Sequence, residues 1–234
     1  MLVRGFPAAA FDTNCWVVAP GAGEECVVID PGIGVEDMLD EVLRQDGLRP
    51  VAVLLTHGHL DHTFSVTPVC GARGIPAWIH PGDRELLADP MKGLSPESRG
   101  IFGGRLEWTE PEDVALLDPA APLELAGMRF AVDFAPGHTP GSVVFQTPGL
   151  DVGGEAAAPV MFSGDVLFAG SIGRTDLPGG SWEQMQDSLA RVVLAAPDET
   201  VVHCGHGAST TIGRERLSNP FLQELAAAPP SRGL

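Results

Sequence analysis

The residues best suited to chemistry lie in one short segment of the chain. Residues 56–62 read THGHLDH, which places three histidines and one aspartate within six positions. Imidazole and carboxylate groups are suitable ligands for zinc, iron or manganese. Histidines spaced i, i+2 cannot converge from one face of a helix. The segment therefore predicts a metal site on extended or turn backbone, which a strand followed by Gly58 would provide.

Seven histidines in 234 residues would produce such a cluster by chance in roughly one chain in ten, so further ligands are needed to support a metal site. Three other apolar runs are each followed by a glycine and a potential ligand: Phe130–Phe134 by His138, Val160–Phe162 by Asp165, and Val201–Val202 by His206. In open α/β sheets, loops beyond the carboxyl ends of neighbouring strands meet in one crevice. The four segments are therefore expected to bring seven ligand side chains together.

The elements that must position these residues alternate between strand and helix. Apolar runs predict strands at Leu2–Phe6, Asn14–Ala19, Cys26–Asp30, Val51–Leu55, Ala77–Ile79, Met128–Phe134, Ser142–Gln146, Val160–Phe162 and Thr200–Val202. One helix is predicted from apolar residues spaced i, i+3, i+4 and i+7 from Val35. A second begins at the capping-box pair Ser181 and Gln184 and carries Trp182 and Met185 on its core face. The alternation indicates an α/β fold class.

The sequence predicts a single domain over residues 1–228, with a short tail at 229–234. The stretch Asp89–Pro122 is rich in Pro, Gly and acidic residues, and it predicts an irregular excursion. Pro148–Ala158 is expected to form a hairpin loop. Neither stretch has the form of a linker between two domains.

Composition excludes several functional classes. The net charge of −17 would repel nucleic acid or an anionic membrane, and the chain has no run of Lys or Arg. No apolar run reaches 18 residues, so no membrane span is expected. Pro7 and Asp12 interrupt the N-terminal segment, which argues against a signal peptide. Four scattered cysteines do not suggest a disulfide framework, so a cytoplasmic location is expected.

The motifs HGHLDH, GHTPGS, SGD and CGHG, in this order, resemble those of the metallo-β-lactamase superfamily, and specifically its short glyoxalase II-like members. The resemblance covers nearly the whole chain. It implies an αβ/βα sandwich in which helices flank two mixed β-sheets. It also implies two divalent metal ions, with zinc expected and iron or manganese as alternatives. One ion would be held by His57, His59 and His138, the other by Asp61, His62 and His206, with Asp165 between them.

The same resemblance implies hydrolysis of a 2-hydroxyacyl thioester of a small thiol, of the S-lactoylglutathione type, by a metal-bound hydroxide. Asp61 and Asp165 would be the catalytic carboxylates. Arg174 would either contact the small-molecule substrate or pair with Asp176 to brace its loop. The thiol stays open, because the chain has no tyrosine and only 28 residues follow His206, whereas longer relatives bind glutathione through a C-terminal region.

Several rival functions are distinguished by single positions. Lactamases with two zinc ions commonly carry Cys where this chain has Asp165, and the lactonase branch relies on a tyrosine. A mononuclear iron persulfide dioxygenase would use His57, His138 and Asp165, so it remains an enzymatic alternative. A catalytically silent metal-binding regulator is the alternative of another class. The other chemistry-bearing residues, His80, His203 and Cys204, are expected to be structural, with a role near the metals as the alternative for Cys204.

Overall fold

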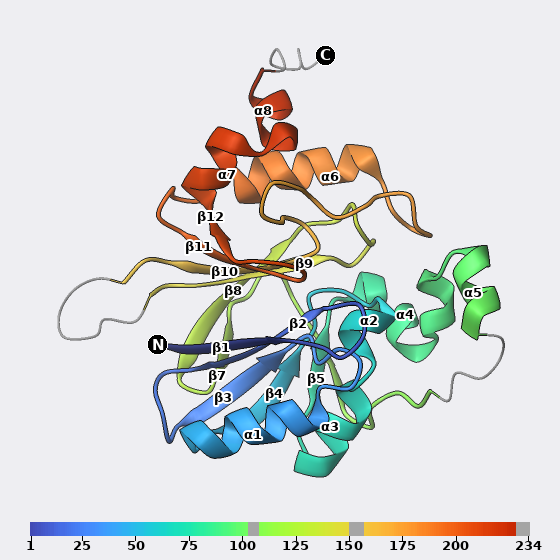
Figure 1. Cartoon of the computed structure of the whole chain (residues 1–234), viewed down its shortest axis with the longest axis vertical. Coiled ribbons are helices and arrows are strands. Elements are labelled where there is room, and N and C mark those ends of the chain that lie inside the picture. The colour runs from blue at the N-terminus through green and yellow to red at the C-terminus, as the bar shows by residue number, and fades with distance from the viewer. Residues whose placement is uncertain (103–107, 150–156, 228–234) are drawn as a thin grey trace.

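The fold consists of two six-stranded β-sheets that face each other, with helices on both outer sides (Figure 1). The computed structural model describes residues 1–102, 108–149 and 157–227. The first sheet is ordered β1 (Leu2–Pro7), β2 (Asn14–Ala19), β3 (Glu25–Ile29), β4 (Arg49–Leu54), β5 (Ala77–Ile79) and β6 (Val114–Leu116). The second is ordered β12 (Thr210–Thr211), β11 (Val201–Cys204), β10 (Val160–Gly164), β9 (Val143–Thr147), β8 (Met128–Phe134) and β7 (Leu123–Leu125).

Both sheets are mixed. In the first sheet β1, β2 and β3 pair antiparallel, whereas β3 to β6 pair parallel. In the second sheet only the β10–β11 pair is parallel among the described strands. Parallel strands are joined by crossover connections, and here helices in these connections cover the outer faces of the sheets. The arrangement confirms the expected sandwich.

The helices fall into three groups. The helices α1 (Glu36–Asp46) and α3 (Val66–Arg73) cover the first sheet, and α6 (Trp182–Ser188), α7 (Ile212–Ser218) and α8 (Pro220–Ala227) cover the second (Figure 1). A π-helical turn, η3 (Leu189–Val193), continues α6. The short helices α2 (Leu60–Thr63), η1 (Pro81–Asp83), α4 (Arg84–Ala88), η2 (Pro90–Gly93) and α5 (Pro96–Phe102) form the third group, in the middle of the chain. Among the described residues, no helix has the length and apolar character needed to cross a membrane.

The apolar segment before the histidine motif shows how the layers pack. Ala52 and Leu54 face the core between the two sheets, whereas Val53 and Leu55 face the core beneath the helices of the first layer. Both faces of β4 are therefore covered, which explains its continuous apolar sequence. Helix α1 also matches its prediction. It begins with Glu36 and Asp37, and it ends before Gly47, whose φ of 66° allows the left-handed cap.

Parts of the predicted element pattern are wrong. The stretch Asp89–Pro122 is not irregular throughout: it contains η2, α5 and β6, while residues 103–107 lie outside the described part. β6 has three residues, none of them buried, and it forms by pairing with β5. β7 was not predicted for the same reason.

Trp182 also differs from its prediction. Its side chain is 41% exposed and contacts Phe221 of α8, because it occupies the first position of α6, beyond the core face on which Met185 is buried. Within the predicted hairpin loop, residues 150–156 lie outside the described part, as does the predicted tail at 229–234.

The core between the sheets provides a test of the packing. Phe145 of β9 is fully buried among residues from both sheets. We expect Phe145→Ala to lower the free energy of unfolding by about 3–5 kcal/mol, because it removes apolar burial and leaves a cavity. Leu217→Ala is the control, since Leu217 is 78% exposed and should change stability by less than about 0.5 kcal/mol. Equal midpoints for the two variants in urea denaturation would contradict this packing.

Candidate metal centre

The seven ligand candidates converge at one edge of the sandwich, from loops that follow strands of both sheets. The HGHLDH motif follows β4, whereas His138, Asp165 and His206 follow β8, β10 and β11 of the second sheet. Their ligating atoms form three compact groups: His57, His59 and His138; His57, His62 and Asp165; and Asp61, His62 and His206. The first and third groups match the two ligand sets implied by the sequence motifs. Asp165 shares its group with members of both.

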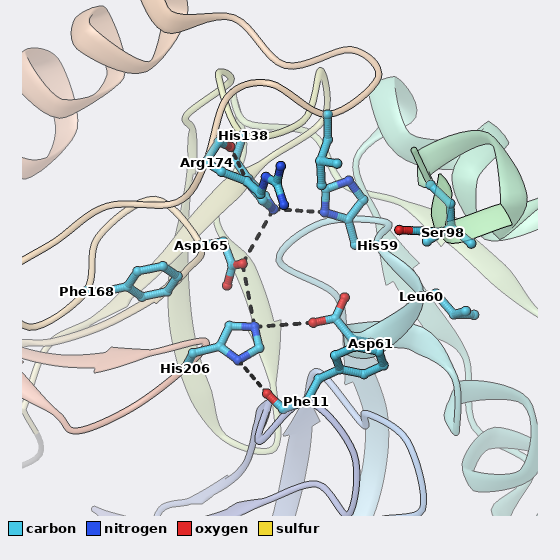
Figure 2. Close-up of a pocket in the computed structure, with 12 residues that line it drawn as sticks. Phe11, His59, Leu60, Asp61, Ser98, His138, Asp165, Phe168, Arg174 and His206 are labelled. Atoms are coloured by element: carbon cyan, nitrogen blue, oxygen red, sulfur yellow. Dashed lines mark hydrogen bonds and ion pairs between the residues drawn. The ribbon is translucent and has the colours of Figure 1, made fainter. Parts of the chain in front are cut away.

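Short distances connect the facing atoms of these side chains. His59 Nδ1 lies 2.8 Å from His138 Nε2, and His62 Nε2 lies 3.3 Å from His206 Nε2. Asp165 lies between the two ends of the cluster, with Oδ1 3.2 Å from His62 Nε2 and Oδ2 3.5 Å from His138 Nε2. Figure 2 shows this carboxylate between His138 and His206. Nitrogen and oxygen atoms that converge so closely form a donor set suited to cations.

Hydrogen bonds on the outer side fix the orientation of four of the imidazoles. In each, Nδ1 faces an acceptor: Thr56 Oγ1 at 3.1 Å from His57, Asp30 Oδ2 at 2.9 Å from His62, the Arg174 carbonyl at 2.7 Å from His138, and the Phe11 carbonyl at 3.1 Å from His206. Nδ1 therefore carries the proton in the neutral ring, and the lone pair of Nε2 points into the cluster. A metal-ligating histidine is typically oriented in this way.

The cluster also contains buried polar atoms that have no hydrogen-bond partner among the described residues. They include Nε2 of His57 and Oδ1 of Asp165, both of which belong to the metal-suited groups. Leaving buried polar atoms unpaired costs free energy, and a bound cation would satisfy them. The fifth histidine differs: His59 turns Nδ1 inward, and its unpartnered Nε2 lies on the other side of the ring. The residues present thus fit two divalent cations.

Burial and mutual charge set the protonation states of the site. Burial lowers the pKa of His57 well below its usual value and that of His59 to about 3, so both rings are neutral. Burial opposes ionisation of Asp61 and Asp165, yet the neighbouring histidines, His62 first, lower the pKa of both carboxyl groups. Burial also disfavours the charged His62, but its carboxylate neighbours raise its pKa. A cation binding His62 Nε2 would have to displace a proton.

Asp30, the last residue of a predicted strand, also belongs to the site, which its sequence position does not indicate. It follows β3 with a φ of 51°, and its buried carboxylate accepts hydrogen bonds from the Thr56 amide (2.8 Å) and the Thr56 hydroxyl (2.6 Å) as well as from His62. Asp30 thereby orients His62 directly and His57 through Thr56. The available sequence signal was an acidic residue between a buried apolar strand and the Pro31-Gly32 turn.

The loop between β1 and β2 also reaches the site, which no spacing pattern indicated. Asn14 holds this loop in place through two hydrogen bonds. Its backbone amide donates to the Gly205 carbonyl at 2.7 Å, and its side-chain amide donates to the Gly207 carbonyl at 2.8 Å. The Thr13 hydroxyl donates 3.1 Å to Asp61 Oδ2. The loop therefore supplies contacts to Asp61 and, through the Phe11 carbonyl, to His206.

A cavity of about 520 Å³ opens beside the cluster (Figure 2). It is lined by Phe11, His59, Leu60, Asp61, Leu94, Ser98, His138, Asp165, Phe168, Arg174, Leu177 and His206. The Arg174 guanidinium donates two hydrogen bonds, of 2.6 and 2.8 Å, to the Asp176 carboxylate, so this pair braces the loop. The Arg174 carbonyl orients His138. A substrate contact by Arg174 stays a prediction.

The remaining chemistry-bearing residues have structural surroundings, as expected. His80 Nδ1 accepts a hydrogen bond from the Gly82 amide, and its ring stacks on Phe134. His203 lies 2.9 Å from the Ser209 hydroxyl and packs on Trp16. Cys204 is buried, and burial raises the pKa of its thiol to about 12. None of the three belongs to the metal-suited groups found in the described residues.

Comparisons with known proteins agree on the family. The family model for the metallo-beta-lactamase superfamily matches residues 8–206. The uncharacterized protein Rv2581c of Mycobacterium tuberculosis is 43% identical over 227 residues, which cover 97% of this chain and 100% of that protein. The hydroxyacylglutathione hydrolase GloC of Haemophilus influenzae is 34% identical over 223 residues, which cover 95% of this chain and 98% of that protein.

Two solved structures have similar folds. The BLEG-1 B3 metallo-beta-lactamase matches with a TM-score of 0.78 and 35% identity, covering 94% of this chain and 99% of that chain. TTHA1623 in a di-iron-bound form matches with a TM-score of 0.74 and 38% identity, covering 94% of this chain and 100% of that chain.

Two histidines close together in sequence allow a matched test of the ligand groups. His206→Ala should reduce bound zinc by one ion per chain, because it removes a donor from the group that contains Asp61 and His62. His203→Ala should leave the bound zinc unchanged, since His203 packs on Trp16 outside the cluster. Metal analysis of dialysed protein measures both. Equal zinc content in the two variants would contradict the ligand assignment.

Proposed function

The chain belongs to the metallo-beta-lactamase superfamily, and from this premise we propose that it is a binuclear metal-dependent hydrolase that cleaves a 2-hydroxyacyl thioester of a small thiol. One observation carries the proposal: Asp165 forms a metal-suited group with His57 and His62, one histidine from each of the other two groups, beside an apolar cavity. The nearly full-length similarity to GloC, a hydroxyacylglutathione hydrolase, supports this substrate class. Zinc is the proposed metal, with iron as the alternative because TTHA1623 is known in a di-iron-bound form.

The group His57, His59 and His138 would hold one cation and the group Asp61, His62 and His206 the other, and Asp165 would contact both. Two bound divalent cations would lower the pKa of a shared water toward neutrality and polarise the thioester carbonyl. Asp165 is suited to hold the groups at a constant separation, since its oxygens face His62 on one side and His138 on the other. The Asp61 carboxylate is partly exposed and lines the cavity, where it can orient a water by accepting a hydrogen bond.

The cavity favours a thioester over a substrate with a poorer leaving group. Every histidine that lines the described cavity, His59, His138 and His206, belongs to a ligand group, so none is free to protonate a leaving group. A thiolate leaves readily without being protonated, because thiols are far more acidic than alcohols or amines. A volume of about 520 Å³ is suited to a small molecule. We propose Arg174 as the cationic contact for such a substrate, at the end of the cavity near His138.

A substrate panel distinguishes this function from its rivals. Turnover is measured with S-lactoylglutathione, other 2-hydroxyacyl thioesters, a β-lactam and a thiol persulfide, the last by oxygen uptake, while metal per chain is counted. We expect thioester hydrolysis with two metal ions per chain. One iron with oxygen uptake would instead indicate a persulfide dioxygenase. Turnover of the β-lactam alone would indicate a lactamase like BLEG-1, and no turnover on the whole panel would favour a regulator.

Replacing Asp165 tests the bridging role. Asp165→Asn should lower kcat for the thioester by roughly 10²-fold or more, because it removes the negative charge between the two groups. Asp46→Asn is a matched control on α1, where the carboxylate pairs with Arg4 far from the ligand groups. Near-normal turnover by Asp165→Asn with two metal ions still bound would exclude this mechanism.

Phe11 tests the substrate side of the cavity. Its side chain is 64% exposed and lines the cavity, whereas its carbonyl is the group that orients His206. Phe11→Ala should therefore raise KM by about three- to tenfold and leave kcat nearly unchanged, because apolar contact is lost while the carbonyl remains. Leu116→Ala removes a comparably exposed side chain that does not line the cavity and should change neither constant. A fall in kcat with constant KM would count against a binding role.

A further inference from the structure

A buried aspartate outside the ligand groups connects two of the loops that carry ligand candidates. Asp83, the last residue of η1, is fully buried. Its carboxylate accepts hydrogen bonds from the Gly58 amide at 2.8 Å, the Thr139 hydroxyl at 2.6 Å and the Gly141 amide at 2.6 Å. We propose that Asp83 is a positioning residue that sets the geometry of the group His57, His59 and His138. This inference rests on the metal-binding part of the proposed function.

The partners of Asp83 lie next to the ligand candidates in the chain. Gly58 separates His57 from His59, and Thr139 directly follows His138. One oxygen, Oδ2, accepts hydrogen bonds from both Gly58 and Thr139, so a single atom joins the two loops. Hydrogen bonds to a carboxylate are shorter and stronger than neutral ones. The spacing between the two histidine loops therefore depends on this carboxylate.

The hydrogen-bond pattern requires an ionised carboxylate. The two backbone amides can only donate, and the Thr139 hydroxyl donates to Asp83 while it can accept from the Ser142 hydroxyl at 2.7 Å. Burial raises the pKa of Asp83, whereas these donors favour its charged form. An asparagine has nearly the same shape, but its NH₂ group can only donate hydrogen bonds. It would replace one of the two oxygens, both of which accept hydrogen bonds here. Asp83→Asn therefore removes the function with little change in volume.

Close backbone packing makes the same junction rigid. A Cβ atom on Gly141 would lie 2.4 Å from the Asp83 amide nitrogen, and one on Gly82 would lie 2.8 Å from the Pro140 carbonyl oxygen. Distances this short show that the η1 segment and the loop after His138 touch backbone to backbone. Small displacements at the junction would therefore pass directly to the histidine loops.

The second ligand group is held by other partners. Asp61 receives a hydrogen bond from Thr13, His62 is oriented by Asp30, and His206 faces the Phe11 carbonyl. None of these partners is bonded to Asp83 in the described structure. Loss of Asp83 should therefore affect one of the two metal sites and spare the other. Loss of a residue that only stabilises the fold would not distinguish between them.

Zinc titration of the full chain against a chromophoric chelator tests this selectivity. In Asp83→Asn, one of the two zinc dissociation constants should rise by about 10- to 100-fold, the usual effect of losing a partner that orients ligands, while the other changes by less than about threefold. Adding Asp83→Asn to His206→Ala should weaken the zinc that remains. Adding it to His138→Ala, where the affected group has already lost a ligand, should have little further effect.

Two further variants separate positioning from folding. Thr139→Val removes one donor to Asp83 and keeps the shape, so it should weaken the same zinc site by a smaller factor. Leu39→Ala removes a buried side chain of α1 and should lower stability without changing the ratio of the two zinc affinities. Unchanged affinities in Asp83→Asn, or equal weakening of both sites, would overturn the inference. A wild-type chain that binds no zinc, iron or manganese would instead overturn the proposed function.

Discussion

Five imidazoles and two carboxylates meet in a largely buried space at one edge of the sandwich, and the rest of the structure depends on that convergence. Without a cation, such a cluster leaves polar atoms unpaired, as at His57 Nε2 and Asp165 Oδ1. Burying these atoms costs free energy that hydrophobic packing elsewhere must offset. In the described part of the chain, three apolar cores, one between the sheets and one beneath each helical layer, provide that packing.

Hydrogen-bond acceptors around the cluster orient four of the histidine rings so that their Nε2 atoms face inward. Asp30 orients both ends of the HGHLDH motif, directly at His62 and through Thr56 at His57, and Asp83 accepts a hydrogen bond from its Gly58 amide. Backbone carbonyls of Phe11 and Arg174 orient the rings supplied by the second sheet. These acceptors come from segments far apart in the sequence. Because the inward lone pairs of four of the five imidazoles depend on outward hydrogen bonds, the chemistry of the site is distributed over both sheets.

The apolar cavity is lined on one side by residues of the polar cluster, and this arrangement limits which substrates the site can bind. Phe11 and Phe168 lie on either side of His206 in Figure 2, while Asp61 and Asp165 face the space between them. A substrate placed there would present its reacting carbonyl to the polar cluster and its remaining atoms to apolar side chains. Arg174 pairs with Asp176 at the cavity wall, so a substrate that contacts the guanidinium would share it with this carboxylate.

Long, strongly patterned elements could be predicted from the sequence, whereas some of the short ones could not. The helix after Val35 and the strand before Thr56 formed as expected, because each buries a face that its apolar spacing defines. β6 and β7 have three residues each, as has the predicted β5, but no residue of β6 or β7 is buried, so burial imposes no clear apolar pattern on their sequences. Trp182 has an apolar side chain at helical spacing, yet its place at the start of α6 leaves it partly exposed.

The sequence by itself determined the types of ligand, their order along the chain and their placement after strands, because glycine-flanked histidines and aspartates at those spacings are a local property. Only the tertiary structure decided which acceptors orient them. Asp30, Asp83 and the Phe11 carbonyl show no ligand spacing, and they reach the site through contacts between segments 25 to 195 residues apart. The contacts of Asp30 and Asp83 depend on which strands lie side by side in the first sheet, and that of Phe11 depends on how the two sheets pack; no local pattern encodes either.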